Sequence, residues 1–472
     1  MKNTKSPIKF GTDGWRAVIG DTFTFENVAK VAQAVSEWVK KDLKPIGGKK
    51  TVCVGYDTRF QSKKFAEIVS KVLAANGIKV FLSSDDCPTP SLSYGVTRKK
   101  CVAGVMITAS HNPGAFNGIK IRTAQGGAAG NDVTSRIESY IDKTPVKNMC
   151  ICDAQKEKKV VLVDLQADHA AFIRKYLDMS KINGAKFKVL CDAMHGSGRN
   201  LMKAVLKDSN IKLTMTRDDI NPWFEGSKPE PIAEYLTATM ARAKKEKFDI
   251  TLVLDGDADR IAAITSDGEF ISPQKILGLL ALHLIRNKGK KGGVVKTTCG
   301  TTMIDNIAAD LGIDLFETPV GFKYISDLMI NRKIVTGGEE AGGMGVQGFV
   351  PERDGTLAGL LLVEMMVFYK KNIKQILADM EKKYGRYYYE RADLALAGRK
   401  FDIEKAKAVK TLLGQKVTEV KDFDGVKLIC DNEDWLMLRP SGTEPLVRAY
   451  SEAKTLKRAK DLLKIGEKLL SA

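Results

Sequence analysis

The chain has 472 residues, 44% of them hydrophobic and 28% charged, with a formal net charge of +18. This length exceeds what one hydrophobic core supports, because domains usually hold roughly 100 to 200 residues. The composition excludes a disordered or low-complexity chain. Because no apolar run can span a bilayer and the first ten residues do not form a signal peptide, we expect a cytoplasmic protein with no membrane partner.

The positive charge has several possible interpretations. It could attract nucleic acid, a membrane or a small anionic substrate. The lysines are dispersed rather than gathered in one segment interleaved with aromatic residues, so we interpret the charge as a solvated surface and expect no nucleic-acid partner. The eight cysteines contain no CxxC pair, so neither a disulfide framework nor a zinc site is predicted.

Helix and strand patterns alternate in the N-terminal part of the chain. The apolar positions of residues 25–41 fall on one helical face, and residues 51–55 are typical of a buried strand. A helix over 63–76 and strands over 78–83 and 102–107 follow. Helices between strands predict a parallel sheet covered on both faces.

The same alternation restarts twice. The second set has expected strands at 186–191, 211–215 and 249–254, with helices from 199 and over 232–247. The third has expected strands at 293–296, 314–317 and 334–336, with helices from 273, 302 and 322. After residue 371 the pattern changes to a helix, a strand over 387–394, a helix over 403–413, paired strands near 426–438 and a helix over 456–470.

These patterns predict an α/β fold made of three tandem α/β domains, with mixed and mostly parallel sheets, followed by an α+β domain. The expected domain boundaries are 1–150, 151–265, 266–371 and 372–472.

The TASHNP loop at 108–113 follows a predicted buried strand. It therefore lies at the carboxyl edge of a parallel sheet, where ligands of such folds usually bind. Ser110 beside His111 supplies a hydroxyl nucleophile and a proton carrier. Taken alone, the loop is equally consistent with an ordinary Asn-Pro turn.

The DGDADR loop at 255–260 places three aspartates between two apolar runs. Carboxylates at this density bind a hard cation such as Mg²⁺ or Ca²⁺, and they would repel one another without one. Arg260 and Ser266 stand where a calcium EF-hand needs Gly and Glu, so an EF-hand is excluded.

Two further loops contain groups that suit a sugar phosphate. Glu339 and Glu340 in GEEAGG at 338–343 can accept hydrogen bonds from sugar hydroxyls, although a glycine turn with exposed acids fits equally well. The GxGxxG pattern at 343–348 is not followed by a helix pattern, which excludes a nicotinamide or flavin site. The hydroxyl residues, glycine and arginines around RPSGTEP at 439–445 favour a phosphate-binding loop over a plain turn.

Together and in this order, FGTDGWRA at 10–17, TASHNP, DGDADR, GEEAGG and RPSGTEP closely resemble the motifs of the α-D-phosphohexomutases, across the whole chain. This family includes phosphoglucomutases, phosphomannomutases and phosphoglucosamine mutases. The resemblance implies four domains around a central cleft and an isomerase that acts as an intramolecular phosphotransferase on hexose phosphates. It also implies Mg²⁺ as cofactor, glucose 1,6-bisphosphate as activator, and a monomer or homodimer.

The resemblance also implies roles for single residues. Ser110 would carry a phosphoryl group and bind Mg²⁺ together with Asp255, Asp257 and Asp259. Arg16 and His111 would lie beside that group, and Lys120 would be a general acid or base, which requires a lowered pKa that cationic neighbours could provide. The implied substrate-binding residues are Thr12, Arg260, Val320, Gly321, Lys323, Glu339, Ala341, Arg353, Arg439, Ser441, Gly442, Thr443 and Arg448.

Glu340 and Thr108 resemble the residues of glucose and mannose mutases, whereas glucosamine mutases more often have Gln and Ser there. We therefore predict interconversion of hexose 1-phosphate and hexose 6-phosphate, with glucose or mannose, through a phosphoserine and a hexose 1,6-bisphosphate. Many relatives have Ser at the position of Ala341, Thr or Ser near Val320, and Lys at the position of Arg353. These differences leave the sugar preference of this chain open. The alternatives are a phosphoglucosamine mutase, a phosphopentomutase, a phosphatase or a non-catalytic anion- or nucleic-acid-binding protein.

Overall fold

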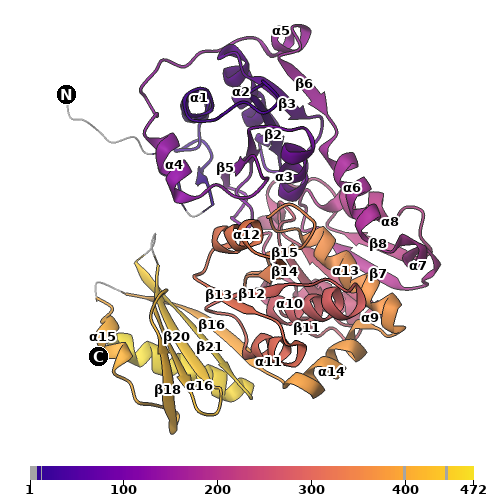
Figure 1. The fold of residues 1–472 in the computed structure, drawn as a ribbon, viewed down its shortest axis with the longest axis vertical. Helices are drawn as coiled ribbons and strands as arrows, with labels where there is room; N and C mark the ends of the chain where they lie inside the picture. Colours follow the sequence, from indigo (N-terminus) through magenta and orange to yellow (C-terminus); the bar gives the residue numbers. More distant parts are fainter. Residues whose placement is uncertain (1–7, 12, 397–399, 442–444, 472) are drawn as a thin grey trace.

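The computed structural model describes residues 8–11, 13–396, 400–441 and 445–471. They form four sheet-based units that follow one another along the chain (Figure 1). The first unit lies at the top of this view, the second and third lie side by side below it, and the fourth lies at the lower left. The predicted class, three α/β units with mixed sheets followed by an α+β unit, is confirmed.

The first sheet has six strands in the order β1-β5-β4-β2-β3-β6. Its bounds are β1 (Trp15–Val18), β2 (Thr51–Tyr56), β3 (Lys79–Ser83), β4 (Ala103–Ile107), β5 (Phe116–Thr123) and β6 (Val160–Val163). Strands β2, β3, β4 and β6 are parallel, whereas β5 is antiparallel to both β4 and β1. Because β6 pairs with β3, this sheet continues past the expected boundary at residue 150.

Helices cover both faces of the first sheet. Val52 and Val54 of β2 belong to one apolar cluster with α1 and α2, whereas Cys53 belongs to another with α3. This alternation is the two-residue period expected of a strand buried on both faces. The helices are α1 (Phe25–Lys41), α2 (Ser62–Ala75), α3 (Thr89–Arg98), α4 (Asn131–Glu138) and α5 (Ile151–Lys156).

The second sheet has the order β11-β10-β9-β7-β8. Its strands are β7 (Lys188–Asp192), β8 (Lys212–Thr216), β9 (Ile250–Leu254), β10 (Ile261–Ile264) and β11 (Phe270–Ile271). Its helices are α6 (Leu165–Tyr176), α7 (Met179–Gly184), α8 (Arg199–Leu206) and α9 (Thr237–Glu246), with short 3₁₀ turns at Phe224–Gly226 and Ala233–Tyr235. Strand β10 returns antiparallel to β9, so the turn between them is held at both ends.

The third sheet has the order β13-β12-β14-β15. Its strands are β12 (Gly293–Thr297), β13 (Leu315–Thr318), β14 (Ile334–Gly338) and β15 (Met344–Val346). Its helices are α10 (Pro273–Leu282), continued by a π-helical turn at His283–Asn287, then α11 (Thr302–Leu311), α12 (Phe322–Asn331), α13 (Gly355–Tyr369) and α14 (Ile373–Tyr384). One apolar cluster runs through the second and third units, and α13 packs against β9 and β10 of the second.

The fourth sheet is antiparallel throughout and has the order β16-β21-β20-β19-β18-β17. Its strands are β16 (Tyr388–Ala395), β17 (Thr411–Leu412), β18 (Gln415–Lys421), β19 (Val426–Cys430), β20 (Trp435–Pro440) and β21 (Leu446–Ala453). Helix α16 (Leu456–Ser471) packs against β16, β20 and β21.

The prediction of one helix over residues 403–413 is wrong. Helix α15 (Ile403–Lys407) ends early, and β17 pairs with β18 through a two-residue turn. Leu413 and Gly414 in this turn have φ values of 49° and 79°, as a type I′ hairpin requires. The segment after Lys407 therefore forms one arm of a β-hairpin instead of a continued helix.

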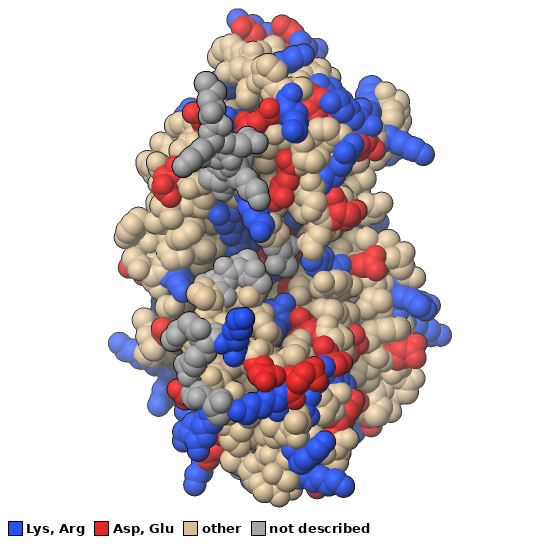
Figure 2. Space-filling view, turned by 90° about the vertical axis from the view of Figure 1, so that its left-hand side faces the viewer, with Lys and Arg blue, Asp and Glu red and all other residues tan. Residues whose placement is uncertain are grey.

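None of the helices in the described ranges combines the length and the apolar character needed to cross a bilayer. The space-filling view shows a hollow at mid-height of one face, between the first and fourth units, with Lys and Arg side chains gathered inside it (Figure 2).

Candidate functional site

Ser110 follows β4 in a tight loop at the carboxyl end of that parallel strand. The residue is 1% exposed and has a left-handed φ of 54°. Its backbone N–H donates to Thr108 Oγ1 at 2.9 Å, and its hydroxyl donates to Asp255 Oδ2 at 3.0 Å. His111 Nδ1 lies 3.5 Å from the same hydroxyl. The structure thus brings the predicted nucleophile against the first aspartate of the predicted metal loop.

A buried arginine that sequence reasoning missed supports this loop. Arg59 is 3% exposed, and its side chain forms an ion pair with Asp57 at 3.2 Å. Its terminal nitrogens donate to four backbone carbonyls at 2.6, 2.5, 2.9 and 3.0 Å, those of Ser110, Asn112, Pro113 and Phe116. The available signal was an acid and an arginine directly after β2, at the same sheet edge as the Ser110 loop.

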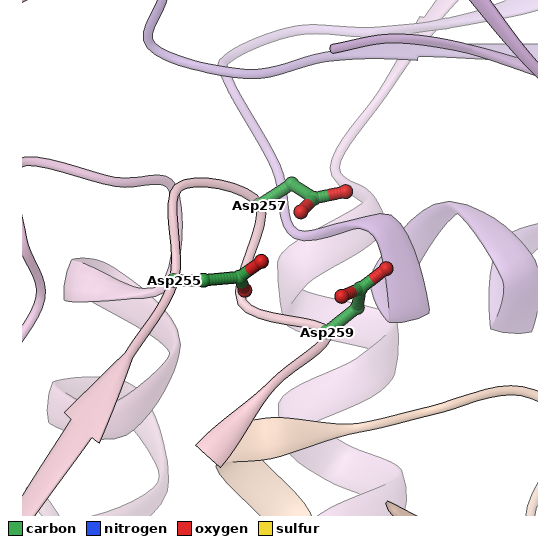
Figure 3. Close-up of side chains that lie close together, drawn as sticks. All are labelled: Asp255, Asp257 and Asp259. Carbon is green, nitrogen blue, oxygen red and sulfur yellow. The ribbon is translucent and has the colours of Figure 1, made fainter. Parts of the chain in front are cut away.

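The three aspartates of the DGDADR turn lie around one point between β9 and β10 (Figure 3). Asp255, Asp257 and Asp259 are fully buried, and each offers one oxygen within 4.8 Å of the others. Asp257 Oδ1 and Asp259 Oδ1 have no hydrogen-bond partner among the described residues. Unpaired buried carboxylate oxygens are costly, so the cluster fits a hard divalent cation such as Mg²⁺.

The raised pKa of Asp255 also indicates a cation site at this turn. Burial raises the pKa of Asp255 well above its usual value, and the neighbouring charges of Asp259 and Asp257 raise it further. A divalent cation would relieve this repulsion. The close approach of the two loops depends on Gly256, because a Cβ there would lie 2.5 Å from the carbonyl oxygen of Ser110.

Basic side chains from other units neutralise part of the aspartate charge. Lys120 Nζ of β5 lies 2.8 Å from Asp257 Oδ2 and 2.8 Å from Asp259 Oδ2. Arg353 Nη2 lies 2.6 Å from Asp259 Oδ2. Both also contact Asp13, at 3.1 and 2.9 Å, a carboxylate that the sequence analysis did not assign.

The expected lowered pKa of Lys120 is not found. Burial alone would lower this pKa, but the carboxylates of Asp13, Asp257 and Asp259 outweigh burial and raise it. Cationic neighbours are present, as the resemblance implied, but the ammonium lies closer to three acids.

The remaining residues predicted around the transferred phosphoryl group lie beside Ser110. Arg16 Nη1 donates to Asn112 Oδ1 at 2.7 Å, and the backbone N–H of Arg260 donates to Asp255 Oδ1 at 3.1 Å. Desolvation lowers the pKa of His111 well below its usual value, and the charges of Arg260 and Arg16 lower it further. These cationic neighbours of His111 make the region beside Ser110 suited to a phosphate dianion.

The predicted sugar-contacting loops come from the third unit. Glu339 begins the turn between β14 and β15 and accepts from Arg353 Nη1 at 3.2 Å. Ala341 lies in the same turn, without a hydroxyl. Val320 and Gly321 lie between β13 and α12, and Lys323 Nζ donates to Asn131 Oδ1 of α4 at 3.0 Å. Lys323 thus reaches from the third unit to the first.

The predicted phosphate loop follows β20 in the fourth unit. Arg439 of β20 lies opposite Arg448 of β21 in the strand register, so two positive charges face one another at this edge. Ser441 N donates to the carbonyl oxygen of Leu446 at 2.9 Å. Three predicted site residues, Thr12, Gly442 and Thr443, lie outside the described residues.

Four family models match nearly the whole chain. They are described as phosphoglucomutase/phosphomannomutase alpha/beta/alpha domains I, II and III and the C-terminal domain of the same family. The matched residues are 7–147, 167–268, 272–384 and 390–465.

Individual relatives match over nearly their full length. A phosphoglucomutase/phosphomannomutase of Thermococcus kodakarensis is 29% identical over 466 residues, covering 98% of each chain. A probable phosphoglucosamine mutase of Methanosphaera stadtmanae is 30% identical over 481 residues, again covering 98% of each. Among solved structures, a Thermus thermophilus protein named as a phosphomannomutase has a TM-score of 0.87 and 31% identity, covering 99% of this chain and 100% of that one. The names of these relatives thus refer to enzymes for more than one hexose phosphate.

Replacing Arg59 tests its support of the Ser110 loop. We expect Arg59→Leu to lower the free energy of unfolding by about 3 to 5 kcal/mol, because Asp57 is left buried without its cationic partner and four carbonyls lose a hydrogen bond from this side chain. Urea denaturation measures this. The control Arg136→Leu removes an arginine that is 53% exposed, and its loss should cost at most about 1 kcal/mol. Equal effects of the two substitutions would contradict the assigned role.

Glu339 gives a second, pH-dependent prediction. Burial raises its pKa from 4.5 to about 7, and Arg353 only partly opposes this. The folded protein therefore binds this proton more tightly than the unfolded chain does. The stability of the wild type relative to Glu339→Gln should be greatest below pH 4.5, fall as the pH rises to about 7 and then level off. Urea denaturation across this pH range measures the difference in free energy of unfolding between the two proteins. A difference that does not change with pH would contradict the prediction.

Proposed function

The chain belongs to the phosphoglucomutase/phosphomannomutase family, whose members are mutases, and we propose that it interconverts the 1- and 6-phosphates of glucose and mannose. The reaction would pass through a phosphoserine at Ser110 and a hexose 1,6-bisphosphate. The observation that carries this proposal is the contact of the buried Ser110 hydroxyl with Asp255, the first residue of a three-aspartate cation site.

Ser110 would exchange a phosphoryl group with the sugar. In the first half-reaction, the bond between Ser110 Oγ and phosphorus breaks while the free hydroxyl of the hexose monophosphate forms a new bond to that phosphorus. The resulting bisphosphate turns over in the cleft, and its other phosphate returns to Ser110. Such transfers depend mainly on positioning and charge neutralisation.

Mg²⁺ held by Asp255, Asp257, Asp259 and Ser110 would supply, when bound, positive charge that offsets the roughly −1.5 to −2 charge of a phosphoserine. Arg16 and Arg260 add fixed positive charge on the side of Ser110. Lys120 keeps its own proton because Asp13, Asp257 and Asp259 raise its pKa, so it would act as a proton donor and not as a base.

The third and fourth units would hold the remainder of the substrate. Glu339 would accept a hydrogen bond from a sugar hydroxyl, and Val320 and Lys323 of the same unit would also contact the sugar. Arg439 and Arg448, which are neighbours in the strand register, would bind the phosphate that is not being transferred, because guanidinium forks match a phosphate dianion.

Phosphoglucosamine mutase is the second candidate, favoured by the name of the Methanosphaera relative. Every proposed catalytic residue would serve it equally. Glu340 and Thr108 support the glucose and mannose assignment, and both side chains form contacts within the site: Thr297 Oγ1 donates to Glu340 Oε2 at 3.0 Å, and Ser110 N donates to Thr108 Oγ1.

A substrate panel tests the proposal. We expect coupled conversion of α-glucose 1-phosphate to glucose 6-phosphate with Mg²⁺, stimulated by trace glucose 1,6-bisphosphate and abolished by chelation. Mannose and glucosamine substrates run in parallel rank the sugars, and higher turnover on glucosamine phosphate would overturn the sugar assignment. Ser110→Ala should reduce turnover to background because the phosphoryl acceptor is lost. The control Ser139→Ala, on an exposed serine of the same unit, should behave as wild type.

A further inference from the structure

Asp424 lies in the turn between β18 and β19 and contacts two units at once. Its Oδ2 accepts from the backbone N–H of Val320 at 2.7 Å and lies 3.4 Å from Thr298 Oγ1, both in the third unit. Its Oδ1 accepts from Arg439 Nε at 2.8 Å within the fourth unit. One carboxylate therefore joins a loop proposed to face the sugar with an arginine proposed to hold a phosphate.

The contact fixes Arg439 by one edge of its guanidinium. Asp424 binds Nε, and among the described residues no hydrogen bond reaches the two terminal nitrogens of Arg439. Those two nitrogens form the fork that matches a phosphate. The Arg439 side chain is 22% exposed and Asp424 is 14% exposed, so the pair is only partly screened by solvent.

Two more contacts hold the 421–427 segment against the third unit. On one side of Asp424, Lys421 Nζ pairs with Glu317 Oε2 of β13 at 3.0 Å. On the other side, Lys427 Nζ donates to the carbonyl oxygen of Thr298 at 2.7 Å. Because both flanks of the turn are anchored, Asp424 has a defined position from which to orient Arg439.

We propose that Asp424 is a positioning residue: it aligns the guanidinium of Arg439 with the Val320–Gly321 loop, so that the distal phosphate and the sugar ring are held in one arrangement. This inference rests on the proposed function, because it assigns Arg439 to a substrate phosphate. Asp424 touches no substrate and acts through Arg439. Loss of the Asp424 carboxylate therefore weakens binding of the bisphosphate, which must stay in the cleft while it turns over.

A double-mutant cycle on glucose 1,6-bisphosphate binding tests the inference. Calorimetry is performed on the full-length chain carrying Ser110→Ala, so that no phosphoryl transfer interferes. Asp424→Asn keeps an oxygen that can accept from Val320 N–H but removes the negative charge beside Arg439. We expect it to weaken binding about tenfold, the size of a lost charge-assisted hydrogen bond.

The second arm of the cycle separates positioning from general structure. Arg439→Met should also weaken binding, and adding Asp424→Asn to it should cause little further loss, because Asp424 acts through that arginine. The control Asp422→Asn alters a 56% exposed acid of the same turn, paired with Lys407, and should bind as its parent does. Thermal melting of each variant accompanies the cycle.

The outcomes are distinguishable. Weaker binding that disappears in the Arg439→Met background supports the inference. Additive losses, unchanged binding by Asp424→Asn, or a lower melting temperature with unchanged binding would overturn it. Failure of the hexose panel with the otherwise wild-type chain would refute the proposed function separately, and absence of bisphosphate binding by the Ser110→Ala parent would overturn both.

Discussion

Three buried aspartates within one five-residue stretch impose the constraint on which the rest of the site depends. Asp255, Asp257 and Asp259 are fully excluded from solvent, and their mutual repulsion must be balanced. Lys120 from the first unit and Arg353 from the third supply part of that balance, and the unpaired oxygens of Asp257 and Asp259 leave room for a cation. Neutralising this turn therefore draws three units together.

The sheets place the chemistry where the units meet. Parallel strands in the first and third units and the β9–β10 hairpin in the second direct their loops toward one region, as expected for ligand sites of α/β folds. A shared apolar cluster joins the second and third units, so their loops have a fixed relation. The fourth unit meets this platform through polar contacts such as Asp424 with Val320, and through an apolar cluster that packs Cys299 against Trp435 and Met437.

The motif loops could be singled out from the sequence because their reactive groups are contiguous and follow buried strands. Ser110 and the three aspartates were found this way, and the structure brings them into contact. Arg59 and Asp424 were missed because they act through backbone carbonyls, a backbone N–H and another side chain, and such contacts leave no pattern along the chain. The helix predicted over 403–413 was wrong because α15 ends at Lys407 and a β-hairpin follows it, and the pKa of Lys120 depended on acids from two distant segments. The expected domain boundaries stay predictions.

The most direct test of the account is phosphorylation of Ser110 itself. The purified chain, first treated to remove any phosphate, would be incubated with glucose 1,6-bisphosphate with and without Mg²⁺, and the modified peptide mapped by mass spectrometry. The account predicts one phosphoryl group, located on Ser110 and acquired much faster with Mg²⁺. Phosphorylation at another residue, or none in the presence of Mg²⁺, would contradict the central claim.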